Sequence, residues 1–163
     1  SGTKTVTTSP DAPTVVAANL IACNSVASMV DWLFSGVFDR FPGIQLLYAE
    51  SQIGWIPYFV ERADDTWQTH QWAQGEERSQ RPPSDYYREH ISACFFKDTV
   101  GIDLLDRIGE DNVLFETDYP HQDGTFPRSK QVAEELFGHL PQPTINKIAR
   151  GNAIKLLGLD FEP

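Results

Sequence analysis

The stretch 116–123 holds the densest set of chemically active side chains in the sequence. It reads Glu-Thr-Asp-Tyr-Pro-His-Gln-Asp and follows an apolar run. An acid directly after a buried strand is placed at the mouth of a sheet, and Pro120 stiffens the turn that presents it. Asp118 could therefore bind a divalent cation, accept a proton or hold an arginine. Alternatively, Asp118 and Asp123 could cap backbone N–H groups, as short acids do in loops.

Two further side chains, His121 and Glu50, could share in this chemistry. His121 could act as a base or a ligand, although a single loop histidine is commonly solvated or a hydrogen-bond donor. Glu50 ends an apolar run, and a buried carboxylate is costly unless it meets a cation, a metal or several donors. We therefore predict such a partner for Glu50. The other histidines, His70, His90 and His139, are expected to be structural or exposed.

Hydrophobic periodicity predicts the elements that position these residues. Residues 1–17 are rich in Ser, Thr and Pro and indicate an extended surface loop, so the folded domain is expected to span 18–163. Short apolar runs predict three buried parallel strands, at 44–50, 90–96 and 112–118. Helical spacing and stop signals predict helices at 18–41, 54–72, 100–108 after an Asp98 or Thr99 cap, 127–140 and 144–157, the last with a break at Gly151-Asn152. Residues 73–85 are predicted to be a surface excursion.

This alternation of helices and strands favours an α/β fold with a parallel sheet and right-handed crossovers. Ligands of such folds gather at the carboxyl ends of the strands. The residues that follow the predicted strands are Glu50, Ser51 and Gln52, then Lys97 and Asp98, then 117–123.

Composition narrows the function classes. The 163 residues are 40% hydrophobic and 22% charged, which is typical of a globular domain. The net charge of −10 opposes nucleic-acid and anionic membrane partners, and we expect neither. No run approaches the roughly 18–20 apolar residues that cross a bilayer. Cys23 and Cys94 lie in apolar stretches and are predicted to be buried, unreactive thiols, which fits a reducing, cytoplasmic location.

Four passages resemble the C-terminal half of the amidohydrolase-related family that includes aminocarboxymuconate semialdehyde decarboxylase. They are Ser-Gly-Val-Phe-Asp-Arg-Phe-Pro-Gly-Ile at 35–44, Glu-Ser-Gln-Ile-Gly-Trp-Ile-Pro-Tyr-Phe-Val-Glu-Arg at 50–62, Asn-Val-Leu-Phe-Glu-Thr-Asp-Tyr-Pro-His at 112–121, and Arg-Gly-Asn-Ala at 150–153. The resemblance covers about 18–159. It implies a TIM (β/α)8 barrel with a divalent metal, usually zinc, at the carboxyl ends of the strands. It also implies decarboxylation or hydrolysis of small carboxylic, often aromatic, substrates.

The resemblance carries roles onto individual residues. Asp118 is similar to the aspartate after strand eight that binds the metal or its water, and His121 to the histidine that follows it. The strand ending at Glu50 resembles strand six, where many members have a catalytic histidine. Glu50 could instead hold a metal-bound water or orient a ligand. Trp55 and Arg62 match residues of the next helix, to which we assign packing.

Other parts of the family pattern are absent from this sequence. The His-x-His pair of strand one and the histidine of strand five have no counterpart, whereas a catalytic zinc needs about three protein ligands. Three strands also fall short of eight, which take about 250 residues. We therefore predict a partial barrel equivalent to strands six to eight, the C-terminal part of a metal-dependent hydrolase or decarboxylase. In isolation it should be inactive, with no tightly bound metal.

Two alternatives remain open at this point. The first is a stand-alone α/β assembly or binding module that forms a homo-oligomer through its open strand edges and inner face. The second is a small metal-free hydrolase that uses Asp118, His121 and Glu50. We rank it last because no serine or cysteine stands in a G-x-S-x-G context.

Overall fold

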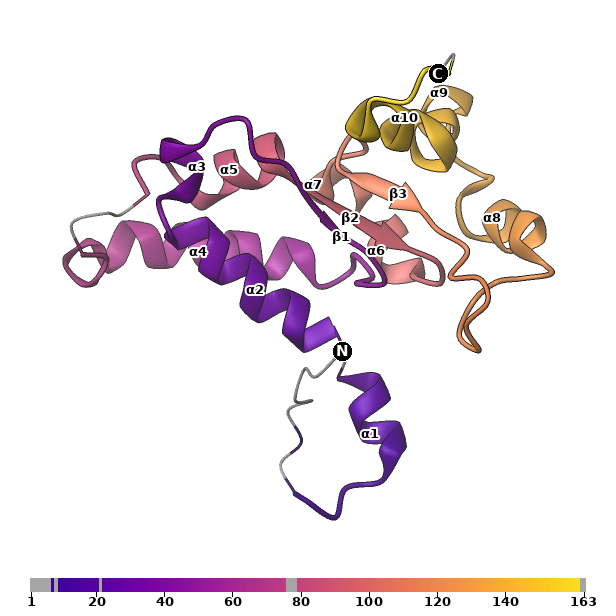
Figure 1. Cartoon of the computed structure of the whole chain (residues 1–163), viewed down its shortest axis with the longest axis horizontal. Coiled ribbons are helices and arrows are strands. Elements are labelled where there is room, and N and C mark those ends of the chain that lie inside the picture. The colour runs from indigo at the N-terminus through magenta and orange to yellow at the C-terminus, as the bar shows by residue number, and fades with distance from the viewer. Residues whose placement is uncertain (1–6, 8, 21, 76–78, 162–163) are drawn as a thin grey trace.

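The computed structural model describes residue 7 and residues 9–20, 22–75 and 79–161. A three-stranded parallel sheet lies at its centre with helices around it (Figure 1). The strands are β1 (Leu46–Tyr48), β2 (Ile91–Phe95) and β3 (Val113–Phe115). The α-helices are α1 (Thr14–Asn19), α2 (Ala22–Phe34), α3 (Val37–Arg40), α4 (Ile56–Thr69), α5 (Pro83–His90), α6 (Thr99–Asp103), α7 (Leu105–Ile108), α8 (Ser129–Phe137), α9 (Gln142–Asn146) and α10 (Asn152–Leu157). A 3-10 turn, η1 (Gln71–Ala73), and a π-helical turn, η2 (Lys147–Gly151), complete the set.

The strand order is β1-β2-β3, and both pairs are parallel. The register pairs Leu46 with Ile91 and Ala93 with Val113. β2 is central and every residue of it is buried, whereas β1 and β3 are edges among the described strands. The α/β class with three parallel strands is thus confirmed. The prediction that the first strand is buried was wrong, because the edge position leaves Leu47 39% exposed.

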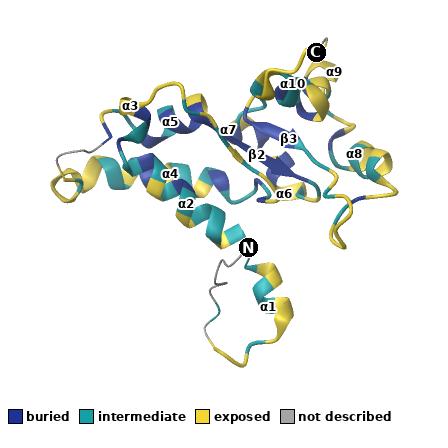
Figure 2. Cartoon of the chain, in the orientation of Figure 1, coloured by how far each residue is buried: buried dark blue, intermediate teal, exposed yellow. Residues whose placement is uncertain are grey.

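The hydrophobic core lies between the sheet and the helices that cover it, as the buried residues in Figure 2 show. Phe95 of β2 packs edge-on against Phe137 of α8, with ring centroids 6.0 Å apart. Phe38 stacks on His90 at 4.4 Å, and the Nδ1 of that histidine lies 2.9 Å from the Ile44 carbonyl. His90 is therefore a structural residue, as predicted. His90 is the last residue of α5, whereas the sequence predicted it as the first residue of the second strand.

The N-terminal segment differs from the prediction. A helix begins at Thr14, within the stretch predicted as loop, and α1 projects away from the sheet in Figure 1. The helix predicted over 18–41 is interrupted at Gly36, whose φ of 65° is left-handed. By length and composition alone, Thr14–Phe34 could cross a membrane, which the sequence analysis did not predict, and only 6% of its apolar window is buried. Within this stretch α2 buries Met29 and Leu33 in the core. Cys23 is exposed, against the prediction, while Cys94 is buried.

Local signals explain the remaining differences. Pro82-Pro83 suggested an irregular loop, but Pro83 stands at the first position of α5, where proline loses no helical hydrogen bond. The Asp98 cap is confirmed, since its side chain accepts from the Gly101 N–H. The helix predicted over 100–108 divides at Leu104 into α6 and α7. The break expected at Gly151-Asn152 is absent, since both residues have helical dihedral angles, and the irregularity in this helical segment is the π-helical turn η2 just before Asn152.

Candidate functional site

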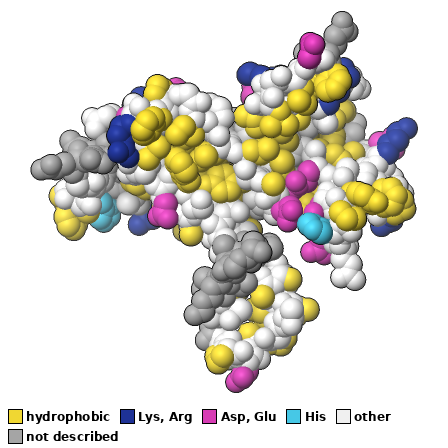
Figure 3. Space-filling model, in the orientation of Figure 1, with side chains coloured by type: hydrophobic (Ala, Val, Ile, Leu, Met, Phe, Trp, Pro, Cys, Tyr) yellow, Lys and Arg dark blue, Asp and Glu magenta, His cyan; other side chains and the backbone are white. Residues whose placement is uncertain are grey.

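Glu50, Asp118 and His121 meet at the carboxyl ends of the strands. Glu50 follows β1, and the other two follow β3. Each offers one ligand atom, and these atoms all lie within 4.8 Å of one another. His121 Nδ1 donates to Asp118 Oδ1 at 2.6 Å and lies 3.9 Å from Glu50 Oε1. Figure 3 shows acidic side chains gathered beside a histidine on the face in view. The structure thus brings together all three predicted site residues.

Exposure differs within this cluster. The Asp118 side chain is only 7% exposed, whereas those of Glu50 and His121 are 50% and 63% exposed. The expectation that Glu50 would be buried was wrong, because it follows an edge strand. Its carboxylate nevertheless faces His121, a group that can carry a positive charge. Asp118 is therefore the member of the three whose side chain is best covered.

Backbone geometry marks the same residues. Glu50 and Asp118 have left-handed φ values of 55° and 52°, and Gln52 has 54°. This region costs a non-glycine residue about 1–2 kcal/mol, and such strain collects at functional sites. Gly124 packs against the loop so closely that a Cβ there would lie 2.7 Å from the Asp118 carbonyl. The loop therefore needs glycine at this position to present Asp118.

Lys97 and Asp98, which follow β2, support the two flanking loops. Asp98 Oδ2 accepts the N–H groups of Ile53 at 2.7 Å and Gly54 at 2.6 Å, both in the loop after β1. Lys97 Nζ donates to the Asp123 carbonyl at 2.7 Å, in the loop after β3. These two candidates therefore hold the site in place from outside the cluster. Trp55 likewise has the packing role predicted for it, since its indole donates to the Ser51 carbonyl at 2.8 Å.

Glu116, to which the sequence assigns no separate role, is a further member of the site. Its Oε1 accepts the Glu50 N–H at 2.7 Å, so it ties the end of β3 to the end of β1. Burial raises its pKa, and the charges of Glu50 and Asp118 raise it further. Burial, together with Glu116, also raises the pKa of the Cys94 thiol to about 12, so this cysteine stays protonated. The sequence signal that could have identified Glu116 is its position directly after the apolar residues of β3.

The acidic neighbours of His121 change its titration. The hydrogen bond to Asp118 raises the His121 pKa above its ordinary 6.5, and the charges of Asp118 and Glu50 add to the rise. Because the pKa of His121 is higher in the folded chain than in the unfolded chain, the contact between protonated His121 and Asp118 stabilises the fold. This stabilisation is complete below the unfolded pKa near 6.5 and is lost as the pH rises through the folded pKa.

We expect an NMR titration of the metal-free chain to give His121 a pKa above 6.5, because Asp118 stabilises its charged form. Asp118→Asn should lower that pKa toward the ordinary value. Asp123→Asn removes a charge from the same loop without touching the hydrogen bond, and should have a smaller effect. Equal shifts in the two variants would contradict the assignment of the Asp118 contact as the main cause.

The donor set fits a divalent metal ion. Two carboxylates and an imidazole are ligands that zinc and manganese accept, and three protein ligands are the usual number at a catalytic metal. Two ligands of one ion at about 2.1 Å can be at most about 4.2 Å apart, so small side-chain movements would close the 4.8 Å cluster. Asp118 would bind the ion, and Glu50 and His121 lie close enough to contact the ion or its water.

Fold and site together define an α/β protein with a metal-compatible carboxylate–histidine cluster at the carboxyl ends of parallel strands. The amidohydrolase family model matches residues 17–159, and the chain belongs to that family.

Solved structures agree with this assignment. The chain is similar to 5-carboxyvanillate decarboxylase from Sphingomonas paucimobilis, with a TM-score of 0.70 and 20% identity, over 84% of this chain and 40% of that one. It is similar to dihydroxybenzoic acid decarboxylase from Polaromonas sp. JS666, solved with manganese and 2-nitroresorcinol, with a TM-score of 0.64 and 24% identity, over 93% and 43%. It is also similar to 2,6-dihydroxybenzoate decarboxylase from Rhizobium, with a TM-score of 0.62 and 24% identity, over 92% of this chain and 44% of that one.

At identities of 20–24%, the similarity to these structures shows the fold of the chain. The three parallel strands and their helices match part of a TIM-barrel amidohydrolase, which confirms the predicted partial barrel. The chain spans less than half the length of each of these three structures. The resemblance seen in the sequence is confirmed as well.

Proposed function

We propose that this chain supplies the C-terminal part of the active site of a metal-dependent decarboxylase or hydrolase that acts on small, often aromatic, carboxylic acids. The observation that carries the proposal is the convergence of Glu50, Asp118 and His121 at the strand ends of an amidohydrolase fold. Decarboxylases of hydroxylated benzoic acids among the similar structures support it, one of them solved with manganese.

The three residues would have distinct roles. Asp118, whose side chain is only 7% exposed, would be the metal ligand. Glu50 occupies the position of the family's usual histidine, and half of its side chain is open to solvent, so it would exchange a proton with the substrate or a water. His121, held by Asp118, would orient that carboxylate and donate a hydrogen bond to an anionic substrate. A bound divalent ion, for which we propose zinc, would supply Lewis-acid polarisation of the substrate.

The 163-residue chain alone should hold metal only weakly and be inactive, because two of its three donors are exposed to competing water. We expect elemental analysis after gel filtration to find well under one zinc or manganese per chain. Added manganese should bind reversibly, and Asp118→Asn should weaken this binding further. A stoichiometric ion that survives gel filtration would contradict this expectation.

The proposal is tested by the coding sequence upstream of Ser1. A reading frame that encodes a strand ending in His-x-His and a later strand ending in histidine would supply the remaining ligands. The absence of both would favour the assembly module.

The exposed edge of β1 favours that second candidate, a module that pairs with another copy. β1 has β2 on one side only among the described strands, and Leu47 is partly exposed. An unpaired edge of this kind is a template for strand addition. Light scattering distinguishes the candidates, since a concentration-independent monomer would make the module untenable.

A further inference from the structure

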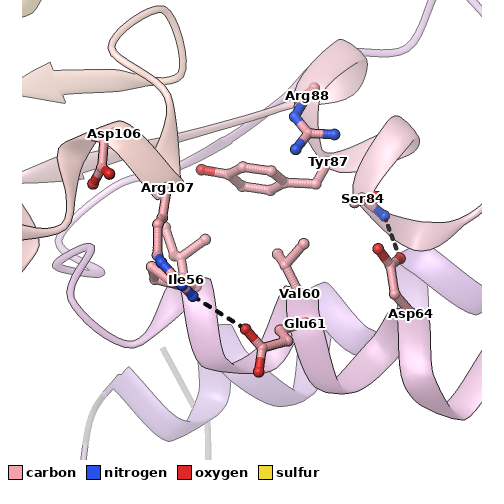
Figure 4. A pocket seen from close by; sticks show the side chains of 10 residues that line it. Ile56, Val60, Glu61, Asp64, Ser84, Tyr87, Arg88, Asp106 and Arg107 are labelled. Atoms are coloured by element: carbon pink, nitrogen blue, oxygen red, sulfur yellow. Dashed lines mark hydrogen bonds and ion pairs between the residues drawn. The ribbon is translucent and has the colours of Figure 1, made fainter.

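A second pocket lies among the outer helices and shares no lining residue with the cluster of Glu50, Asp118 and His121. It has a volume of about 370 Å³ and is formed by α4, α5 and α7 (Figure 4). This volume falls within the range of about 300–1,000 Å³ that is usual for small-molecule sites. Its lining residues are Ile56, Pro57, Val60, Glu61, Asp64, Ser84, Tyr87, Arg88, Asp106 and Arg107.

The Tyr87 hydroxyl is the unusual group of this pocket. Tyr87 is 2% exposed, and its hydroxyl has no hydrogen-bond partner among the described residues. In Figure 4 the ring crosses the upper side of the pocket, with the hydroxyl directed toward the segment that carries Arg107. Buried polar atoms are nearly always paired, so this one needs a partner from outside the described residues. Burial raises its pKa, and the phenol therefore remains an O–H donor that lacks an acceptor.

Most charges at the rim already have partners. Arg107 pairs with Glu61 at 3.1 Å, and Asp64 accepts the Ser84 N–H at 2.8 Å. Arg88 is exposed, and its guanidinium makes no hydrogen bond or ion pair with the described residues, yet its charge is close enough to act on Tyr87. Asp106, an acid with no ion pair among the described residues, lies across the pocket from Arg88 in Figure 4. The upper side of the pocket in Figure 4 therefore offers a cation near one end of the Tyr87 ring and an unused hydroxyl donor at the other end.

Apolar side chains form the wall below these two donors. Ile56 is buried, and Val60 lies one turn further along α4. Figure 4 shows both side chains on the α4 side of the pocket, facing Tyr87 across it. An occupant with a compact apolar body would cover them.

We propose that this pocket binds a small organic carboxylate with an apolar body. The carboxylate accepts from the Tyr87 hydroxyl and from the Arg88 guanidinium, and the body packs against Ile56 and Val60. Charge-assisted hydrogen bonds of this kind are the stronger ones, and they satisfy the buried hydroxyl. The site stands apart from the proposed function, because neither donor belongs to the strand-end cluster.

The test is a titration of the 163-residue chain with benzoate, followed by NMR chemical shifts. We expect saturable shifts around α4, α5 and α7, and weaker binding of benzyl alcohol, which has the same ring without the charge. Tyr87→Phe and Arg88→Gln should each weaken benzoate binding about tenfold. Tyr58→Phe and Arg62→Gln are the matched controls, since both residues are exposed on α4 outside the pocket, and they should leave binding unchanged.

A second measurement separates this site from the strand-end cluster and from a bound water. Asp118→Asn should leave the benzoate shifts unchanged. Tyr87→Phe should raise the melting temperature of the ligand-free chain, because it removes an unpaired buried hydroxyl. It should also reduce the stabilisation by a given concentration of benzoate, because it binds benzoate about tenfold more weakly. The proposal is overturned if benzoate does not saturate, or if it binds Tyr87→Phe as tightly as the unmodified chain. A lower melting temperature of ligand-free Tyr87→Phe, as expected if water alone fills the site, would overturn it too.

Discussion

In the complete enzyme that we propose, Asp118→Asn is expected to reduce the rate of decarboxylation or hydrolysis by about a thousandfold or more. The substitution keeps the shape of the side chain but removes the charge of the carboxylate that is best covered in the cluster. Loss of metal polarisation costs several kcal/mol of transition-state stabilisation, and about 4 kcal/mol corresponds to a thousandfold. The measurement is product release from a panel of hydroxybenzoates at saturating manganese, with the metal content of each variant determined in parallel.

Asp123→Asn is the matched control for this prediction. Asp123 lies in the same loop, and only its backbone carbonyl takes part in a described contact, with Lys97. The control should therefore retain activity and metal. An Asp118→Asn enzyme that is fully active, or one that loses activity while keeping its metal, would show that Asp118 does not act as a ligand.

Asp98→Ala is expected to destabilise the chain by about 3 kcal/mol. Its carboxylate accepts three backbone N–H groups, from Ile53, Gly54 and Gly101, at 2.6–2.8 Å. Each lost hydrogen bond costs about 1 kcal/mol, and donors left without a partner add to that cost. Urea unfolding monitored by circular dichroism measures the change in the free energy of unfolding.

Asp103→Ala tests whether the effect is specific. Asp103 is an exposed acid at the end of the same helix, α6, and its replacement should cost less than about 0.5 kcal/mol. Asp98→Asn keeps an acceptor oxygen and should fall between the two, which keeps the comparison usable if the alanine variant does not fold. Similar losses at Asp98 and Asp103 would refute the anchoring role of Asp98.

Much of the fold was predictable because its signals are local. Apolar runs bounded by breakers located all three strands, and the Asp98 cap located the start of α6. Helix α5 was missed because Pro82-Pro83 indicates a loop and a helix start equally well. Its tertiary contacts decide between them, since Tyr86 and Tyr87 are buried in the core.

The residues of the site were predictable from the sequence, but their solvent exposure and their hydrogen-bond partners were not. Glu50, Asp118 and His121 were identified because they follow strands, and parallel strands bring their carboxyl ends together. The exposure of Glu50 depends on β1 being an edge, which is a property of strand order. The tie between Glu116 and the Glu50 N–H joins positions far apart in the chain, and no local pattern encodes it.

The register of the sheet has a consequence for how the chain folds. The paired residues Ala93 and Val113 are 20 positions apart, whereas Leu46 and Ile91 are 45 apart. Closing the longer loop costs about 0.7 kcal/mol more in chain entropy. We therefore expect the β2–α6–α7–β3 segment to form the folding nucleus, with β1 adding to it later. Asp118 follows β3, which belongs to the nucleus, whereas Glu50 follows β1, which adds later. The two residues would therefore come together only in the last step of folding.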